Sequence, residues 1–172
     1  MAETSLITIT NIQTYREIDP KFNQIRFDGF VNEIQRTNLR DLLGGSLYYA
    51  FMADGRTAGI YADLLNGKMY TKDGETIQYY GLIPMLCYWW LTVAARESEL
   101  FQSAYGSIQL VNNQQQSFES AREKERIAVS YMERAQSYAN DTILFLNSSS
   151  ASYPLWKGDD ERNVTEFVSF RV

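Results

Sequence analysis

The sequence predicts a mainly α-helical fold: a compact helical bundle with a small β-hairpin and a C-terminal extended strand. Apolar residues recur at three- and four-residue steps over long stretches, as they do on the buried face of a helix. An Asp-Gly dipeptide lies between two β-prone stretches, which is typical of a hairpin turn. The last nine residues alternate between two faces, which is the period of a strand. We therefore expect a single domain, residues 1–172, with a helical body at about 19–147, a hairpin at 68–79 and a C-terminal arm at about 153–172.

Composition excludes several function classes. The chain has 172 residues, of which 45% are apolar, and carries 16 Lys and Arg against 21 Asp and Glu, a net charge of −5. A chain of this length buries about 70% of its unfolded surface, so it can fill a core without disulfides or metal. It has no histidine, which excludes Ser-His-Asp triads, Cys-His pairs and imidazole zinc sites. The acidic balance argues against a dedicated duplex-DNA binder. The one cysteine excludes an internal disulfide, so the cytosol is the default place of synthesis.

Asp19-Pro20 predicts the start of the first long helix, because Asp accepts hydrogen bonds from first-turn amides and Pro lacks the amide that would stay unpaired there. The helix should end at Gly44-Gly45. Two short helical pieces should follow, at Leu47–Ala53 and Ile60–Leu65. The residues expected on the buried face of the first helix are Phe22, Ile25, Phe30, Val31, Ile34, Leu39 and Leu42.

A β-hairpin is predicted at Lys68–Tyr79, with Asp73-Gly74 as its turn. The most apolar stretch of the chain, Leu82–Ala95, follows it. This stretch has 14 residues, fewer than the roughly 18 of a membrane span. It therefore predicts a buried core helix from Gly81 to about Ala104, with Pro84 tolerated in the first turn. The residues expected to pack are Met85, Leu86, Trp89, Trp90, Val93, Leu100 and Phe101.

A second long helix is predicted to end at about Leu146. It should begin after the capping box Ser120-Ala-Arg-Glu123, for which Ser117 is the alternative cap. Its expected apolar stripe comprises Ala121, Ala128, Met132, Ala135, Ala139, Ile143 and Leu146. Charged residues are expected outside, namely Arg122, Glu125, Arg126, Glu133 and Arg134. Short loops are expected at Gln114–Gln116 and Ser148–Ser150.

Both ends of the chain contain β-prone residues. Near the N-terminus these are Leu6–Ile9. In the last nine residues, Val164, Glu166, Val168, Phe170 and Val172 fall on one face, and Thr165, Phe167, Ser169 and Arg171 on the other. A lone terminal strand needs an edge with which to pair. Two alternatives remain open: it pairs with an edge of another chain, or with a strand at Leu6–Thr10 of its own chain.

We assign no catalytic, cofactor-binding or metal-ligating residue, and we expect neither an enzyme nor a bound cofactor. Cys87 lies among Leu, Met and Trp and is interpreted as a small core residue. Gly44-Gly45-Ser46 lacks the Lys-Ser/Thr ending of a phosphate loop and is interpreted as a helix stop. The carboxylates expected on solvated faces are Glu97, Glu99, Glu119, Glu123, Glu125, Glu133 and the run Asp159-Asp160-Glu161.

Aromatic residues are abundant: 12 Tyr, 9 Phe and 3 Trp. They include the adjacent groups Tyr48-Tyr49, Tyr79-Tyr80 and Tyr88-Trp89-Trp90. Adjacent residues on a helix point in different directions, so these side chains should not all enter one core. Two interpretations remain open: the aromatic residues fill and cover a large core, or some of them contact partner proteins.

Three motifs, in order along the chain, resemble a known family. They are Leu-Arg-Asp-Leu-Leu-Gly at 39–44, Tyr-Ala-Asp-Leu-Leu-Asn-Gly at 61–67 and Tyr-Gly-Leu-Ile-Pro-Met-Leu at 80–86. With the helices around them they resemble the head-to-tail connector proteins of tailed bacteriophages, in particular the ring or adaptor proteins of crAss-like and other phages of Bacteroides-type hosts. The resemblance extends over about Asp19 to Leu146 and includes no catalytic signature.

The resemblance implies a structural virion protein that forms an oligomeric ring of about twelve copies. Such a ring lies below the portal, connects the portal and capsid to the tail and continues the DNA channel. The implied partners are copies of the chain, the portal protein and other connector or tail proteins, with genomic DNA met only in passage and no membrane. The implied location is the head–tail junction of the virion, after synthesis in the cytoplasm of the host bacterium. By position alone, the segments that would reach neighbours are residues 68–79 and 153–172.

An alternative function belongs to a different class. The chain would be a cytosolic helical binding module for an apolar ligand or a partner peptide, with its aromatic side chains as the walls of a pocket.

Overall fold

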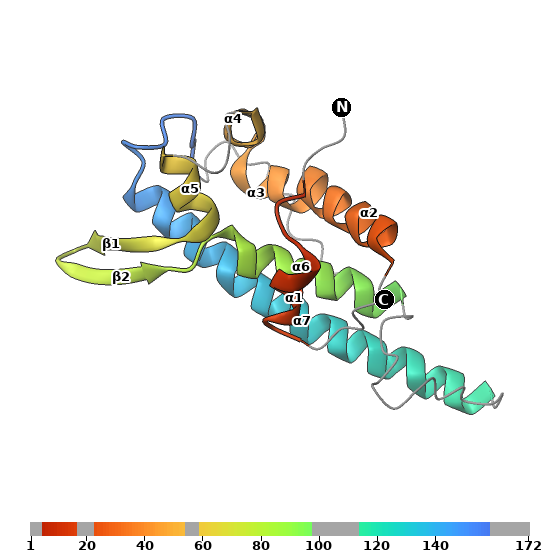
Figure 1. Cartoon of the computed structure of the whole chain (residues 1–172). Helices are drawn as coiled ribbons and strands as arrows, with labels where there is room; N and C mark the ends of the chain where they lie inside the picture. Colours follow the sequence, from red (N-terminus) through yellow and green to blue (C-terminus); the bar gives the residue numbers. More distant parts are fainter. Residues whose placement is uncertain (1–4, 17–22, 54–58, 98–113, 159–172) are drawn as a thin grey trace.

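The computed structural model describes residues 5–16, 23–53, 59–97 and 114–158 (Figure 1). Within these ranges the fold is mainly helical and includes a two-stranded antiparallel hairpin, which confirms the predicted class. The two long helices α6 (Leu82–Glu97) and α7 (Gln114–Ser148) run antiparallel, side by side, through the centre of the molecule. Helix α2 (Gln24–Ile34) and the short α1 (Ile9–Gln13) pack against α6.

The first predicted helix begins later than expected. Asn23 caps α2, because its side chain accepts hydrogen bonds from the two amides at the start of the helix. The predicted start at Asp19-Pro20, with Phe22, lies outside the described residues. The prediction that Ile25 is buried is wrong, since 84% of it is exposed. The buried face runs through Phe27, and a residue two positions earlier lies about 200° around the helix axis.

The segment that follows α2 contains a feature that the spacing of apolar residues did not predict. A π-helical segment, η1 (Gln35–Leu39), joins α2 to α3 (Arg40–Leu43). A π-helical turn adds one residue to the repeat, which explains why Ile34 and Leu39 are both buried although they are five residues apart. The predicted stop is confirmed: α3 ends at Gly44, whose φ is +74°, and α4 (Gly45–Ala53) begins at the next residue.

The hairpin follows the predicted bounds. Strands β1 (Lys68–Lys72) and β2 (Glu75–Tyr79) pair antiparallel around Asp73-Gly74, and both turn residues have positive φ, +53° and +85°. These values are typical of the two-residue turn whose twist matches that of the strands. Figure 1 shows that the hairpin projects from one end of the helical body.

The root of the hairpin is a close contact between two backbone segments. Helix α5 (Gly59–Asn66) leads into the hairpin through Gly67, and α6 leaves it through Gly81. A Cβ atom on Gly67 would lie against the carbonyl oxygen of Tyr79, and one on Gly81 against the carbonyl oxygen of Leu65. Only glycine allows the entering and leaving chains to lie this close together.

Helix α6 is buried on nearly every side. Between Leu82 and Ala95, all residues except Ile83 and Val93 are buried, including Pro84 in the first turn. The expected packing of Met85, Leu86, Trp89 and Trp90 is confirmed. The predicted contacts of Leu100 and Phe101, and the predicted end near Ala104, lie outside the described residues.

Helix α7 has 35 residues, which corresponds to about 50 Å at about 1.5 Å per residue. It begins at Gln114, so the predictions of a loop at Gln114–Gln116 and of a cap at Ser117 or Ser120 are wrong. Residues of the capping type also occur inside continuous helices, so a capping motif by itself does not show where a helix begins. The predicted apolar stripe is confirmed at Ala128, Ala135, Ala139 and Leu146, which are buried, and Ile143 is half-buried against the core. The prediction is wrong for Met132, which is 39% exposed. The charged residues expected outside are exposed: Arg122, Glu125, Arg126, Glu133 and Arg134.

The two ends differ from the predicted strands. Leu6 and Ile7 are buried but lie in bends, and Thr8 caps α1 with a capping box shared with Asn11. The predicted N-terminal strand is therefore wrong, because its apolar residues enter the helical core individually. It cannot be the partner of a C-terminal strand in this structure, and the predicted strand at 164–172 lies outside the described residues.

No helix in the described ranges combines the length and the apolar character needed to cross a membrane.

Candidate interaction surfaces

The hairpin is one of the two segments that the resemblance assigned to a contact with neighbours, and most of its residues are exposed. On one face, Tyr70 and Tyr79 pack on Phe145 of α7, with ring centroids 5.3 and 4.2 Å away. On the other face, Met69, Thr71, Thr76 and Gln78 are exposed. The hairpin is therefore held by one face at its root and presents its other face and its strand edges.

Tyr79 fixes this root through its hydroxyl group as well as its ring. The hydroxyl donates to the carbonyl oxygen of Leu64, one of the last carbonyls of α5, at 3.0 Å. It also lies 3.3 Å from Oγ1 of Thr142 on α7. Burial raises the pKa of Tyr79 well above its ordinary value, so its proton stays in place at any physiological pH.

The loop after α7 closes the same aromatic cluster. The ring of Tyr153 lies 5.8 Å from that of Phe145, and its hydroxyl donates to the carbonyl oxygen of Ile60 at 2.7 Å. The indole nitrogen of Trp156 donates to Oδ1 of Asn147 at 2.8 Å. The start of the C-terminal arm is thus attached to the body by two buried aromatic residues.

A second aromatic cluster connects the turn after α1 with α6 and α7. The rings of Tyr88 and Tyr138 are stacked at 5.9 Å, and Tyr15 and Tyr131 lie within 5.3 and 6.3 Å of Tyr88. Tyr80 extends the cluster toward solvent, with its ring 6.2 Å from Tyr138 and 56% of the residue exposed. The cluster is therefore mostly core, with one edge at the surface.

Two arginines cover this tyrosine cluster. Arg16 donates from Nε to the hydroxyl of Tyr131 at 3.2 Å and lies 5.5 Å from the ring centroid. Arg134 lies 5.7 Å from the ring centroid of Tyr88. Burial, followed by the negative charge that Cys87 and neighbouring tyrosines would carry, raises the pKa of Tyr15 to about 12. The phenol of Tyr15 therefore stays protonated and uncharged at neutral pH.

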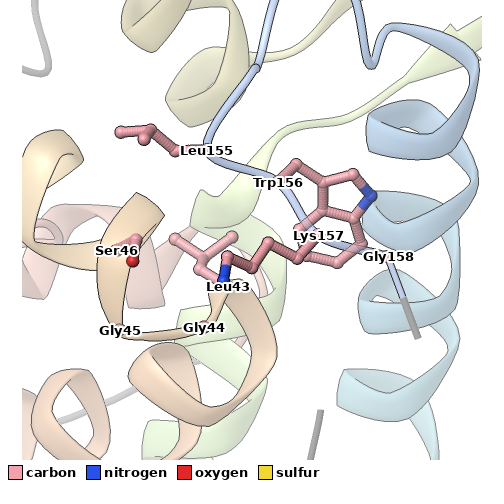
Figure 2. Close-up of a pocket in the computed structure, with 8 residues that line it drawn as sticks. All are labelled: Leu43, Gly44, Gly45, Ser46, Leu155, Trp156, Lys157 and Gly158. Carbon is pink, nitrogen blue, oxygen red and sulfur yellow. The ribbon is translucent and has the colours of Figure 1, made fainter. Parts of the chain in front are cut away.

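A pocket lies where the C-terminal loop meets the corner between α3 and α4 (Figure 2). It is lined by Leu43–Ser46 and Leu155–Gly158, and Lys157 extends toward the α3–α4 corner. Its volume is about 200 Å³, less than the roughly 300–1,000 Å³ of typical small-molecule sites. The pocket therefore gives no support to the alternative of an apolar-ligand module.

The described residues contain no group of three or more His, Cys, Asp or Glu side chains placed to hold a metal ion. Cys87 is buried as predicted, and burial raises the pKa of its thiol to about 12. Of the carboxylates, Glu125 pairs with Arg96 across the α6–α7 contact at 3.0 Å, and Glu133 is exposed. The side chains of Glu97, Glu99, Glu119, Glu123 and Asp159-Asp160-Glu161 lie outside the described residues.

The structure resolves part of the question about the aromatic residues. In two adjacent groups one ring is buried and the next is exposed: Tyr48 and Tyr79 are buried, whereas Tyr49 and Tyr80 are exposed. All three rings of the group at 88–90 are buried, because α6 is covered on opposite sides by α2 and α7.

The tyrosine cluster was not among the features predicted from the sequence. A signal was present, since Tyr131 and Tyr138 are seven residues apart and therefore lie on one face of α7. Nothing in the local sequence indicated the contribution of Tyr15, because the turn after α1 reaches α6 only in the folded chain.

The fold and these surfaces define a small helical protein that presents a strand edge and aromatic side chains. The chain belongs to a family of unknown function, DUF6712, whose sequence profile matches residues 39–166. The match begins at the end of η1 and spans the hairpin and both long helices. Comparison with curated proteins and with solved structures found no match.

Proposed function

We propose that this chain is a structural protein of a tailed-phage virion, a subunit of an oligomeric ring that connects the portal and capsid to the tail. The ring would contain about twelve copies and would continue the DNA channel. The protein would act without catalysis, by binding copies of itself, the portal protein and other connector or tail proteins.

One observation carries the proposal: the second and third of the motifs that carry the resemblance form the parts that set the hairpin on the body. The motif at 39–44 ends α3 at Gly44. The motif at 61–67 forms most of α5 and ends at Gly67, and the motif at 80–86 contains Gly81 and begins α6. The second and third motifs touch through these last two glycines. A rigid root that presents a projecting hairpin suits a subunit that must reach a neighbour.

The net charge supports the same function. The chain carries a charge of −5, and a channel wall with the sign of DNA keeps the duplex from adhering as it passes. Genomic DNA would therefore be met only in the lumen.

Peptide mass spectrometry of purified phage particles tests this proposal. We expect the chain in mature particles in a ratio to the portal protein close to one to one, and crosslinked to it. Its absence from washed particles, with the portal protein present, would overturn the proposal. Major capsid protein from the same digest serves as the internal standard.

A further inference from the structure

The hairpin has two outer strand edges, and its register fixes which backbone groups each edge presents. Because the turn has two residues, the pair next to it exchanges both backbone hydrogen bonds, and every second pair does the same. The amide and carbonyl groups of Met69 and Thr71 therefore point away from β2, and those of Thr76 and Gln78 point away from β1. No backbone hydrogen bond joins these four residues to another element in the described parts of the chain. Both edges can accept a further strand.

The C-terminal arm contains a sequence with the period of such a strand. In Val164–Val172, one face combines four apolar residues with Glu166, and the other carries Thr165, Phe167, Ser169 and Arg171. These nine residues exceed the five of β1, so they can pair along the whole edge. Added strands gain affinity from backbone hydrogen bonds and specificity from alternate side chains.

Charge favours the edge of β1. That strand carries Lys68 and Lys72, whereas β2 carries Glu75. Residues 159–172 hold four acidic side chains and two basic ones. Lys68, Tyr70 and Lys72 share one face of β1. Glu166 lies on the mostly apolar face of the arm. If that face is on the same side of the sheet as Tyr70, Glu166 lies on the same side as both lysines.

The course of the chain argues against pairing with its own hairpin. Tyr153 and Trp156 attach the loop to the body, and Gly158 then lies at the α3–α4 corner (Figure 2). The hairpin projects away from that corner (Figure 1). Gly158, the last described residue before the strand-like segment, therefore lies at a corner from which the hairpin points away (Figure 1).

We infer that the β1 edge is the docking site for the segment Val164–Val172 of a second copy of this chain. Such a contact joins two different surfaces, and it closes a ring when the rotation between neighbouring subunits divides a full turn. The inference deepens the proposed function, on which it rests, by naming the surfaces through which neighbouring subunits join.

Disulfide crosslinking between two full-length variants tests the inference. One carries Thr71→Cys, and the other, labelled with ¹⁵N, carries cysteine in place of Thr165, Phe167 or Ser169, one position at a time. The native Cys87 is fully buried and does not compete. The two are mixed at about millimolar protein, the effective concentration between tethered neighbours. We expect at least one mixed disulfide enriched roughly tenfold over the like-with-like dimers, a preference of about 1.4 kcal/mol.

Matched variants identify the edge and the face. Thr76→Cys lies directly opposite Thr71 on the other edge, and Val168→Cys lies on the other face of the arm; neither should give enrichment. Met69→Pro removes an outward amide but no hydrogen bond of the hairpin, and should lower the mixed yield roughly two- to tenfold, as expected for one hydrogen bond. Gln78→Pro removes the outward amide on β2, together with the side-chain hydrogen bond from Gln78 to the carbonyl oxygen of Tyr79, and should leave the yield unchanged.

The outcomes separate this inference from the proposed function. Enrichment at Thr76→Cys, equal enrichment at every position, or no enrichment at all would overturn the inference. So would a monomeric internal disulfide in one chain that carries both Thr71→Cys and an arm cysteine. If particles contain the chain and the crosslink fails, only the strand pairing is wrong. If particles lack the chain, the proposed function is wrong whatever the crosslinks show.

Discussion

Substituting Gly81 by alanine tests how the hairpin is set on the helical body. Gly81 has a φ of +82°, and its Cβ would lie against backbone atoms of Leu65, Asn66 and Gly67. Gly74 in the hairpin turn has nearly the same φ, +85°, but nothing lies within 4 Å of its Cβ. Both substitutions therefore carry the free-energy cost of a left-handed backbone conformation, and only Gly81→Ala adds a steric clash.

The expected magnitudes follow from this difference. A left-handed conformation costs an alanine about 1–2 kcal/mol, which is the whole effect expected for Gly74→Ala. Forcing a methyl group into packed atoms costs about 1–3 kcal/mol more, so Gly81→Ala should lose about 2–5 kcal/mol. For a chain of this size about 1 kcal/mol lowers Tm by about 2–4 °C.

Urea unfolding followed by circular dichroism measures both variants beside the unsubstituted protein. We expect a lower midpoint with an unchanged m-value for each, and the larger shift for Gly81→Ala. Equal shifts for the two variants would refute the close backbone contact at the hairpin root.

Three further predictions concern buried polar groups. Tyr79→Phe leaves the carbonyl of Leu64 without its hydroxyl donor and should lower the free energy of unfolding by about 1–3 kcal/mol in urea titrations. Gln35→Ala removes the buried side-chain oxygen that accepts from the amide of Leu6 at 2.7 Å, and should speed hydrogen exchange of that amide. The pKa of Cys87 rises from 9.0 to about 12 on folding, so the neutral thiol favours the native state. The resulting stability is complete below pH 9 and is lost as the pH rises toward about 12, which urea titrations at stepped pH will detect.

Each of these predictions has a control. Tyr49→Phe removes a hydroxyl from an exposed residue and should change stability by less than about 0.5 kcal/mol; an effect as large as that of Tyr79→Phe would contradict the first prediction. Gln136→Ala removes an exposed amide and should leave exchange at Leu6 unchanged, whereas unaltered exchange in Gln35→Ala would exclude the second. If Cys87→Ala loses stability between pH 9 and 10 as steeply as the unsubstituted protein, the thiol is not the cause.

Local chemistry was sufficient to predict several elements. Asp73-Gly74 has the two positive φ angles that a two-residue hairpin turn requires, so the register followed directly. Gly44 ended a helix for the same conformational reason. Leu82–Ala95 is apolar on all sides, so it could only be a core helix or a membrane span, and its length favoured the first.

Features that depend on distant parts of the chain were not predictable from such patterns. Ile25 is exposed because α6 packs on the other face of α2, the one that carries Phe27. The spacing of apolar residues in α2 fits either face and does not say which one α6 covers. The contact between Gly67 and Gly81 joins two segments on either side of the hairpin. The amide of Leu6 donates to the side-chain oxygen of Gln35, 29 residues away. This hydrogen bond helps to hold a β-prone segment in a helical core.

The candidate surfaces were predicted in part for the same reason. The aromatic groups were contact candidates from composition, and the hairpin was one because of the family resemblance. The hairpin is exposed, as a contact surface must be. Which tyrosines are buried depends on how the turn after α1 packs with α6 and α7, because Tyr15, Tyr88 and Tyr138 come from these three segments.

The central claim is that this chain works as a ring subunit at the head–tail junction. The most direct test is a cryo-electron microscopy reconstruction of the head–tail junction, with the rotational symmetry of the connector and tail imposed. We expect a ring of density below the portal that accommodates α6, α7 and the projecting hairpin in every subunit. A junction in which other proteins account for all the density, with this chain elsewhere in the particle or missing from it, would contradict the account.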